Sequence, residues 1–244
     1  MRRYRARPVS TPTIRVVPPA EQSGRFGDLT IDEFITRLGS SEPVPGGGSA
    51  SAVAAALGAS LVRMVASLST GRQKFAEHED LLAWAIAAGD KLTARFLELA
   101  DDDAAAYAGF AAALKLPKTT DAETNARRAA LRSAARHASE VPLACVEACL
   151  DLASVTEALA GRSNPNASSD LNVAALLAEA SARGAAANVL INLPSIADPE
   201  VEGELTTRVT ELLSAIEDLA TRTREVVGSG EPAEPRPAPE SRLT

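Results

Sequence analysis

The sequence contains only two cysteines among its 244 residues, and aromatic residues make up 3% of it. It has no run of 18 uninterrupted apolar residues, and we therefore predict that no segment spans a membrane. Its N-terminal residues lack the apolar core of a secretory signal peptide. Because these features favour a reducing compartment, we expect a cytoplasmic protein.

The two cysteines, Cys145 and Cys149, stand four residues apart among apolar neighbours. A metal site built on them would need His or Cys partners at local spacing, and neither His78 nor His137 is placed to provide one. We expect both thiols to be small buried core groups, and we predict no metal ion.

Charge is unevenly distributed along the chain. Residues 1–25 contain six arginines and one acid, a charge of +5 against −7 for the whole chain, so the remainder carries −12. Such an acidic body is a poor match for a nucleic-acid backbone, and we expect no nucleic-acid partner. Proline-rich composition at both ends predicts a disordered leader over residues 1–28 and a disordered tail over residues 229–244.

Alanine is the abundant residue, with 49 copies, and it favours helices over strands. No segment alternates with period two for long enough to form a strand. We predict an all-α antiparallel bundle of about six helices, several of them long, completed by homodimer packing. The first helix starts at Thr30, and the others cover about 49–69, 75–114, 121–160, 168–192 and 199–227. We expect a kink at Pro142 inside the fourth helix.

The glycine run Gly46, Gly47 and Gly48 stands directly before Ser49 and the second helix. Glycine permits positive φ and close approach of a ligand, and a helix start offers free N–H groups. The alternative is a flexible connector with Ser49 as the helix cap. A phosphate-binding Walker loop would need a lysine after its last glycine, and a dinucleotide fingerprint would need a glycine in place of Ser51, so both nucleotide motifs are excluded.

Asp101, Asp102 and Asp103 follow one another in the third predicted helix. At 100° per residue, only Asp103 falls on the apolar stripe, which comprises Phe96, Leu99, Tyr107 and Phe110, while Asp102 falls with Glu98 on another face. A carboxylate on a buried stripe must be paired, raised in pKa or functional. We therefore hypothesise a functional role for Asp103.

Several polar residues have both a structural and a ligand-binding interpretation. The segment SNPNASSD holds more helix-capping residues than one helix needs: Asn164, Asn166, Ser168, Ser169 and Asp170. Asn188 and Asn192 stand four apart on an otherwise apolar helix and are either structural clamps or ligand contacts. For Arg72, Lys74 and Lys118 at helix ends, solvated surface charge is the ordinary interpretation.

Five segments occur together in this order: EPVPGGGSASAVAAALGASLVRMV, STGRQKF, DDDAAAYAGFAAALKLPK, EVPLA and NPNASSDLNVAALLAEASARGAAANVLINLPSI. Together they resemble the cyclodeaminase/cyclohydrolase family of folate enzymes. The resemblance covers about residues 29–227, and it rests on the joint occurrence of PxPGGGS, KLPK, SDLxVAA and INL.

The resemblance implies an all-helical dimer that binds folate beside the glycine loop and acts on the one-carbon bridge of tetrahydrofolate without a metal or redox cofactor. It implies that Asp103, together with Asp101, is catalytic. It maps the family's glycine loop onto Gly46, Gly47, Gly48 and Ser49 and its Ser–Asp pair onto Ser169 and Asp170, with Arg72, Lys74 or Lys118 for the glutamate tail. Asn166, Asn188 and Asn192 are further candidate substrate contacts, chosen from their residue type and position alone.

Within this resemblance, we expect a methenyltetrahydrofolate cyclohydrolase, because no formiminotransferase domain accompanies the helices. A formiminotetrahydrofolate cyclodeaminase is the first alternative. A helical binding or scaffold protein that has lost catalysis is the second, although the glycine loop, Asp103 and the Ser169–Asp170 pair are all present.

Overall fold

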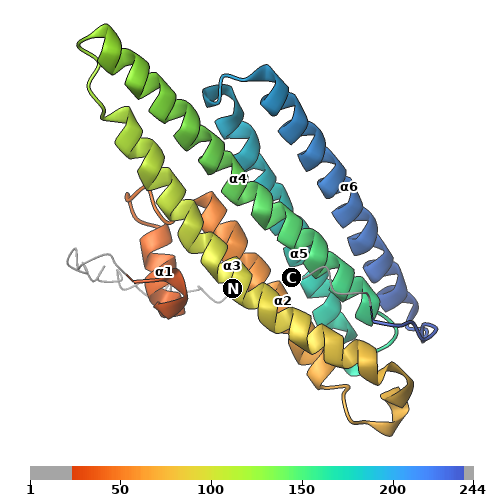
Figure 1. The fold of residues 1–244 in the computed structure, drawn as a ribbon. Helices are drawn as coiled ribbons and strands as arrows, with labels where there is room; N and C mark the ends of the chain where they lie inside the picture. Colours follow the sequence, from red (N-terminus) through yellow and green to blue (C-terminus); the bar gives the residue numbers. More distant parts are fainter. Residues whose placement is uncertain (1–23, 239–244) are drawn as a thin grey trace, which may run out of the picture.

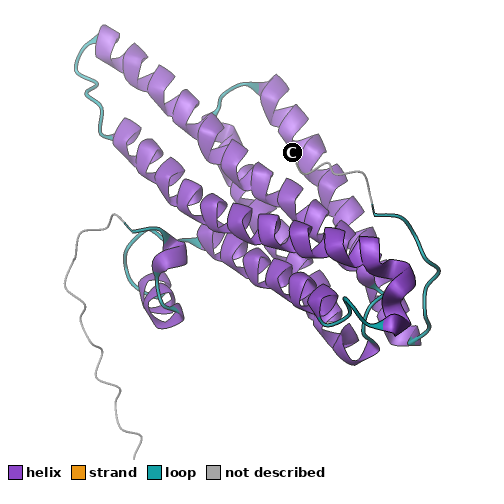
Figure 2. Ribbon diagram, turned by 60° about the horizontal axis from the view of Figure 1, so that its bottom comes forward, coloured by secondary structure: helices purple, strands orange, loops and turns teal. Residues whose placement is uncertain are grey.

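The computed structural model of the protein describes residues 24–238. These residues form six α-helices and four short 3₁₀ helices and contain no strand (Figures 1 and 2). The helices are α1 (Ile31–Leu38), α2 (Gly47–Ser67), α3 (Glu79–Leu114), α4 (Asp121–Leu159), α5 (Ser168–Asn192) and α6 (Pro199–Ser229). The 3₁₀ helices are η1 (Phe26–Asp28), η2 (Gln73–His78), η3 (Pro165–Ala167) and η4 (Leu193–Ser195). The predicted all-α fold is confirmed.

The five long helices form two layers. Helices α3, α4 and α6 lie in one layer, and α2 and α5 lie behind them in Figure 1. Helix α2 packs on α3 and α5, while α4 packs on α3, α5 and α6. Neighbouring α2 and α5 are antiparallel, since Gly58 lies against Ala174 and Leu177, whereas Ser51 lies against Gly184. Small residues at these positions let the two backbones approach closely.

Capping residues set several helix ends. Thr30 and Glu33 form a capping box at the start of α1, as predicted. At α4 the cap is Thr120, which accepts a hydrogen bond from the Glu123 N–H, and Asp121 is the first helical residue. The third predicted helix instead begins as the 3₁₀ helix η2, so α3 starts at Glu79.

The core is built mainly from alanine with a few larger side chains. Cys145 and Cys149 are free and buried in it, as predicted. The Cys145 thiol and burial raise the pKa of Cys149 well above its ordinary value. Two segments, α2 and residues 165–195, are long and apolar enough to cross a membrane, but 50% and 44% of their apolar windows are buried inside the bundle.

Part of the predicted tail lies against the helical bundle. Residues 1–23 of the predicted leader and 239–244 of the predicted tail lie outside the described residues. The described part of the tail contacts the end of α4: the Ala233 N–H donates to the Gly161 carbonyl at 2.9 Å, and Arg236 pairs with Glu157 at 2.8 Å. These contacts hold residues 233–236 against the bundle.

Candidate functional site

The start of α2 meets the middle of α3 at a single carboxylate. Asp103 Oδ2 accepts a hydrogen bond from the Ser49 N–H at 2.8 Å and one from the Ser49 hydroxyl at 2.9 Å. Ser49 is fully buried, and its hydroxyl oxygen is also 3.0 Å from the Ala100 carbonyl. The glycine loop and Asp103, which the sequence predicted as functional separately, are therefore one structural unit.

Gly48 is the glycine that this arrangement requires. A Cβ atom at Gly48 would overlap the Asp103 carboxylate, whereas a Cβ at Gly47 would lie 3.8 Å from Asn188 Nδ2 in ordinary contact. None of the three glycines has positive φ, so the conformational argument made from the sequence is wrong here. The requirement is for space beside a carboxylate.

The surroundings of Asp103 change along α3. Phe96 and Leu99, which precede it on the same stripe, are buried, while Tyr107 beyond it is 46% exposed. The reason is that α2 begins at Gly47 and covers α3 only on one side of Asp103. The carboxylate therefore lies where the packed core opens to solvent.

Burial raises the pKa of the Asp103 carboxyl above its ordinary value, and the two hydrogen bonds from Ser49 partly offset this effect. Both bonds go to Oδ2, while Oδ1 lies against Gly48. A carboxyl group of this kind can hold or release a proton closer to neutral pH than an exposed aspartate can.

Helix α5 contributes Asn188 to the same end of the bundle. Its amide Nδ2 donates to the Gly184 carbonyl at 2.9 Å and lies beside Gly47. Asn192 donates to the Ala138 carbonyl at 2.8 Å and so joins α5 to α4. Asn192 is thus a structural clamp, and Asn188 is the asparagine that borders the glycine loop.

The other two acids of the triplet point away from this site. The Asp101 carboxylate accepts a hydrogen bond from the Phe26 N–H at 2.7 Å and pairs with Arg25 at 3.4 Å. It holds η1 on α3, so the structure does not bring it together with Asp103, and its catalytic role stays a prediction. Asp102 is exposed and lies 3.9 Å from Arg95, on the face predicted for it.

A second group of predicted site residues lies at the opposite end of the bundle. It consists of Arg72, Lys74, Asn164, Asn166, Ser168, Ser169 and Asp170. Ser69, which follows α2, accepts a hydrogen bond from the Asn164 N–H at 2.8 Å and so joins these loops. Asp170 precedes Asn188 by 18 residues of α5, which at about 1.5 Å per residue is about 27 Å. One chain therefore does not unite the two groups.

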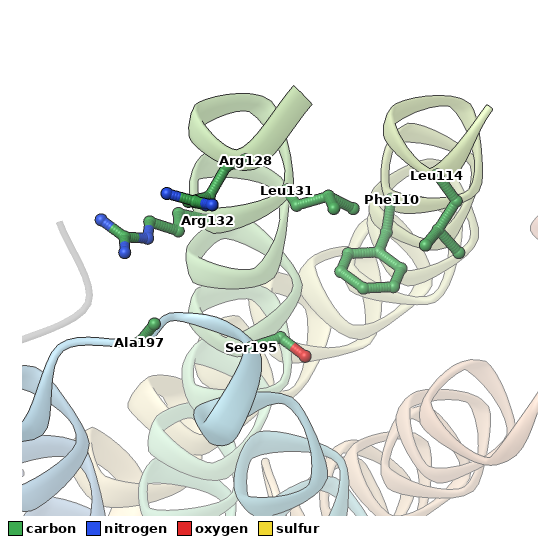
Figure 3. A pocket seen from close by; sticks show the side chains of 7 residues that line it. All are labelled: Phe110, Leu114, Arg128, Leu131, Arg132, Ser195 and Ala197. Carbon is green, nitrogen blue, oxygen red and sulfur yellow. The ribbon is translucent and has the colours of Figure 1, made fainter. Parts of the chain in front are cut away.

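Near the tip of the bundle, beyond Asp103, the structure has a cavity that the sequence did not predict. This arginine cavity, of about 440 Å³, is lined by Phe110, Leu114, Arg128, Leu131, Arg132, Ser195 and Ala197 (Figure 3). Lys118, in the loop between α3 and α4, is exposed and does not line it. A signal for the cavity was available, since residues 124–139 contain four arginines and no acid in an otherwise acidic chain.

Among residues 24–238, no group of three or more His, Cys, Asp or Glu side chains is arranged to hold a metal ion. A smaller hollow of about 330 Å³ lies at the other end of the bundle, beside Arg72 and Glu79.

Comparison with known proteins gives consistent results. Residues 30–211 match the family described as Formiminotransferase-cyclodeaminase. The chain is 37% identical over 203 residues to a methenyltetrahydrofolate cyclohydrolase of Methylorubrum extorquens, an alignment that covers 83% of this chain and 98% of that protein. It is 34% identical over 214 residues to the formimidoyltransferase-cyclodeaminase of Rattus norvegicus, covering 88% of this chain but only 39% of that longer protein.

The crystal structure of formiminotetrahydrofolate cyclodeaminase from Thermotoga maritima has a similar fold. Its TM-score to this structure is 0.76 at 27% sequence identity, with 83% of this chain and 98% of that chain covered.

Proposed function

Because the chain belongs to the formiminotransferase-cyclodeaminase family, we propose that it acts on the one-carbon bridge of tetrahydrofolate as a methenyltetrahydrofolate cyclohydrolase. The reaction adds water to the methenyl carbon between two nitrogens and opens the ring to 10-formyltetrahydrofolate. The observation that carries the proposal is the partly buried Asp103 carboxyl, held by Ser49 at the start of α2 where the bundle opens.

Asp103 has the properties that this chemistry needs. As the attacking water forms its bond to carbon, its proton passes to Asp103, and the carbon becomes tetrahedral. The carboxyl then protonates the departing ring nitrogen as the carbon–nitrogen bond breaks, and the hydroxyl proton passes to solvent as the formyl C=O forms. A general acid–base group works best when its pKa is near the operating pH, which is the direction in which burial shifts Asp103.

Gly47 and Asn188 complete the immediate surroundings. A side chain at Gly47 would project beside the Asn188 amide, so glycine leaves this approach open to a flat ring. The Asn188 amide nitrogen is held by the Gly184 carbonyl, which fixes the orientation of the group. We assign these residues to substrate binding and Asp103 to catalysis.

Formiminotetrahydrofolate cyclodeaminase activity is the second candidate. It is favoured by the similarity to the Thermotoga maritima cyclodeaminase and to the rat protein, and it would use the same carboxyl for proton transfer. Purified protein should be assayed side by side with methenyl- and formimino-tetrahydrofolate. We expect faster turnover of the methenyl compound; faster ammonia release from the formimino compound would reverse the assignment, and no turnover of either would contradict both.

We further propose that the protein is a homodimer with the outer face of α2 and α5 as its interface. The exposed large apolar side chains on these two helices, and on the residue directly after α2, are Leu57, Met64, Leu68, Val173, Leu176, Leu190 and Ile191. This face runs the length of the bundle and connects the two separated groups of site residues. A two-fold axis near Leu57 and Leu176 would place the Asp170 end of one subunit beside the Asp103 end of the other.

The dimer has a direct test. Light scattering should give about twice the chain mass of 25.3 kDa. Leu57→Glu should shift the protein toward the monomer, whereas Leu114→Glu, at a leucine of similar exposure outside this face, should not. A folded wild-type monomer would contradict the proposal.

The free thiols of Cys145 and Cys149 also fit the cytoplasmic location that we propose.

A further inference from the structure

The arginine cavity lies on the same side of α3 as Asp103. Phe110 and Leu114, which line it, follow Asp103 by 7 and 11 residues, about two and three helical turns. At a rise of about 1.5 Å per residue, they lie about 10 and 16 Å further along that face. A ligand whose one end reaches Asp103 can therefore extend along α3 into the cavity.

The cavity has an apolar part and a basic part. Figure 3 shows Phe110 and Leu114 on α3 facing Leu131, while Arg128 and Arg132 extend from the other side of α4. The two arginines are four residues apart on one helix, so their side chains are neighbours. The arrangement suits a ligand with an aromatic body and an anionic end.

The positive charge here is not neutralised within the described chain. Other arginines of the bundle form ion pairs with a glutamate on the same helix or on a neighbouring helix: Arg183, Arg208 and Arg224. Arg128 and Arg132 make no ion pair or hydrogen bond with any of residues 24–238. Two unpaired guanidinium groups line the cavity on the side of α4 away from Leu131 and are available to an anionic ligand.

We propose that the arginine cavity binds the glutamate end of the folate substrate, with Arg128 and Arg132 on its carboxylates and Phe110 and Leu131 against the aminobenzoyl ring. This inference rests on the proposed function. The cavity combines an apolar wall with two guanidinium groups, the two chemical classes that match the ring and the carboxylates of a folate. Arginine matches a carboxylate because its planar guanidinium donates two parallel hydrogen bonds.

Within one chain, the assignment differs from the residues that the sequence offered for this role. Arg72 and Lys74 follow α2, whose last residue, Ser67, is 18 residues and about 27 Å along the helix from Ser49. Within one chain they are therefore too far from Asp103 to hold the tail of a folate bound there.

The test compares methenyltetrahydrofolate with methenyltetrahydropteroate, which has the same reacting ring but no glutamate. For wild-type protein, kcat/KM should be higher with the folate. In the Arg128→Gln/Arg132→Gln variant it should fall about 10- to 100-fold for the folate, as expected for lost charged hydrogen bonds, and stay unchanged for the pteroate. Arg222→Gln, at an exposed arginine of α6, is the matched control and should change neither value.

Two results would overturn the inference. One is an unchanged preference for the folate in the double variant; the other is an equal loss for both substrates, which would mean that the arginines act on the fold or on the reacting ring. If wild-type protein turns over neither substrate, the proposed function fails instead.

In that case, binding at the arginine cavity is tested by titration with N-(4-aminobenzoyl)glutamate, which carries the ring and both carboxylates without the pterin. Binding to the wild type should be at least about tenfold tighter than to the double variant. Equal binding to the two proteins would contradict a carboxylate site at Arg128 and Arg132.

Discussion

The two ends of the bundle carry similar residue types but differ in how completely the chain builds a site there. At the Asp103 end, three helices supply a buried serine that is hydrogen-bonded to a perturbed carboxyl, a glycine loop in contact with that carboxyl, and an asparagine beside the loop. At the other end, Ser169 and Asp170 lie on the first turn of α5, with Ser169 exposed. The first end can carry chemistry by itself, whereas the second needs something else beside it.

The largest expected effect is on catalysis, which we assign to the Asp103 end. Asp103→Asn keeps the shape and removes the proton transfer, so turnover should fall by about 10²–10⁴-fold while folate still binds. Asp102→Asn, on an exposed face of the same helix, is the control and should remain close to wild type. Equal losses in both variants would mean that the acids act only through their total charge.

A second prediction concerns the space beside Asp103. Gly48→Ala places a methyl group on the carboxylate, which should cost roughly 1–3 kcal/mol of stability and also impair activity. Gly47→Ala meets only an ordinary contact and removes a helix glycine, so it should be neutral or slightly stabilising. Chemical denaturation of the two variants checks this, and the reverse order of stability would show that Gly48 is not the residue in close contact.

The third prediction addresses the Asp170 end. If this carboxylate anchors the substrate, Asp170→Asn should raise KM about tenfold or more and leave kcat nearly unchanged. Asp218→Asn, at an exposed acid on α6, is a control of the same type. An unaltered KM would reduce Asp170 to a residue of the α5 first turn, where an acid stabilises the helix end.

The smallest expected effect is on the way in which the stability of the folded protein changes with pH. The pKa of Asp103 is raised on folding, so the native state binds this proton more tightly than the unfolded state does. The stabilisation that comes from this proton is fully present at pH values below the pKa of Asp103 in the unfolded chain. It is lost as the pH rises through the pKa of Asp103 in the folded protein. Asp103→Asn should therefore gain stability relative to wild type as pH rises from 4 to about 8. Melting curves across this range check it, and a parallel pH dependence would show that burial does not perturb the carboxyl.

The sequence predicted most of what lies along each helix. The bounds of α5, Ser168–Asn192, follow from the polar segment before it and the Leu193–Pro194 pair after it, as predicted. Helical periodicity also separated Asp103 from Asp102, because the face of a residue depends only on its position along its own helix.

Helical periodicity does not predict which residues on different helices lie close together. Asp101 was grouped with Asp103, but its partners Arg25 and Phe26 are about 75 residues away in sequence. The glycine run was explained by conformation, when the need for space at Gly48 arises from a side chain on another helix. Which site residues share one end of the bundle depends on the lengths and directions of all the helices together.

The most direct test of the account is to mix the Asp103→Asn and Asp170→Asn variants, allow subunit exchange, and assay at a substrate concentration well below KM, where each variant alone has little activity. If each site takes Asp103 from one subunit and Asp170 from its partner, a mixed dimer contains one site with both wild-type residues, and activity should recover to about a quarter of wild type. Activity no greater than the average of the two variants alone would contradict a site shared between subunits.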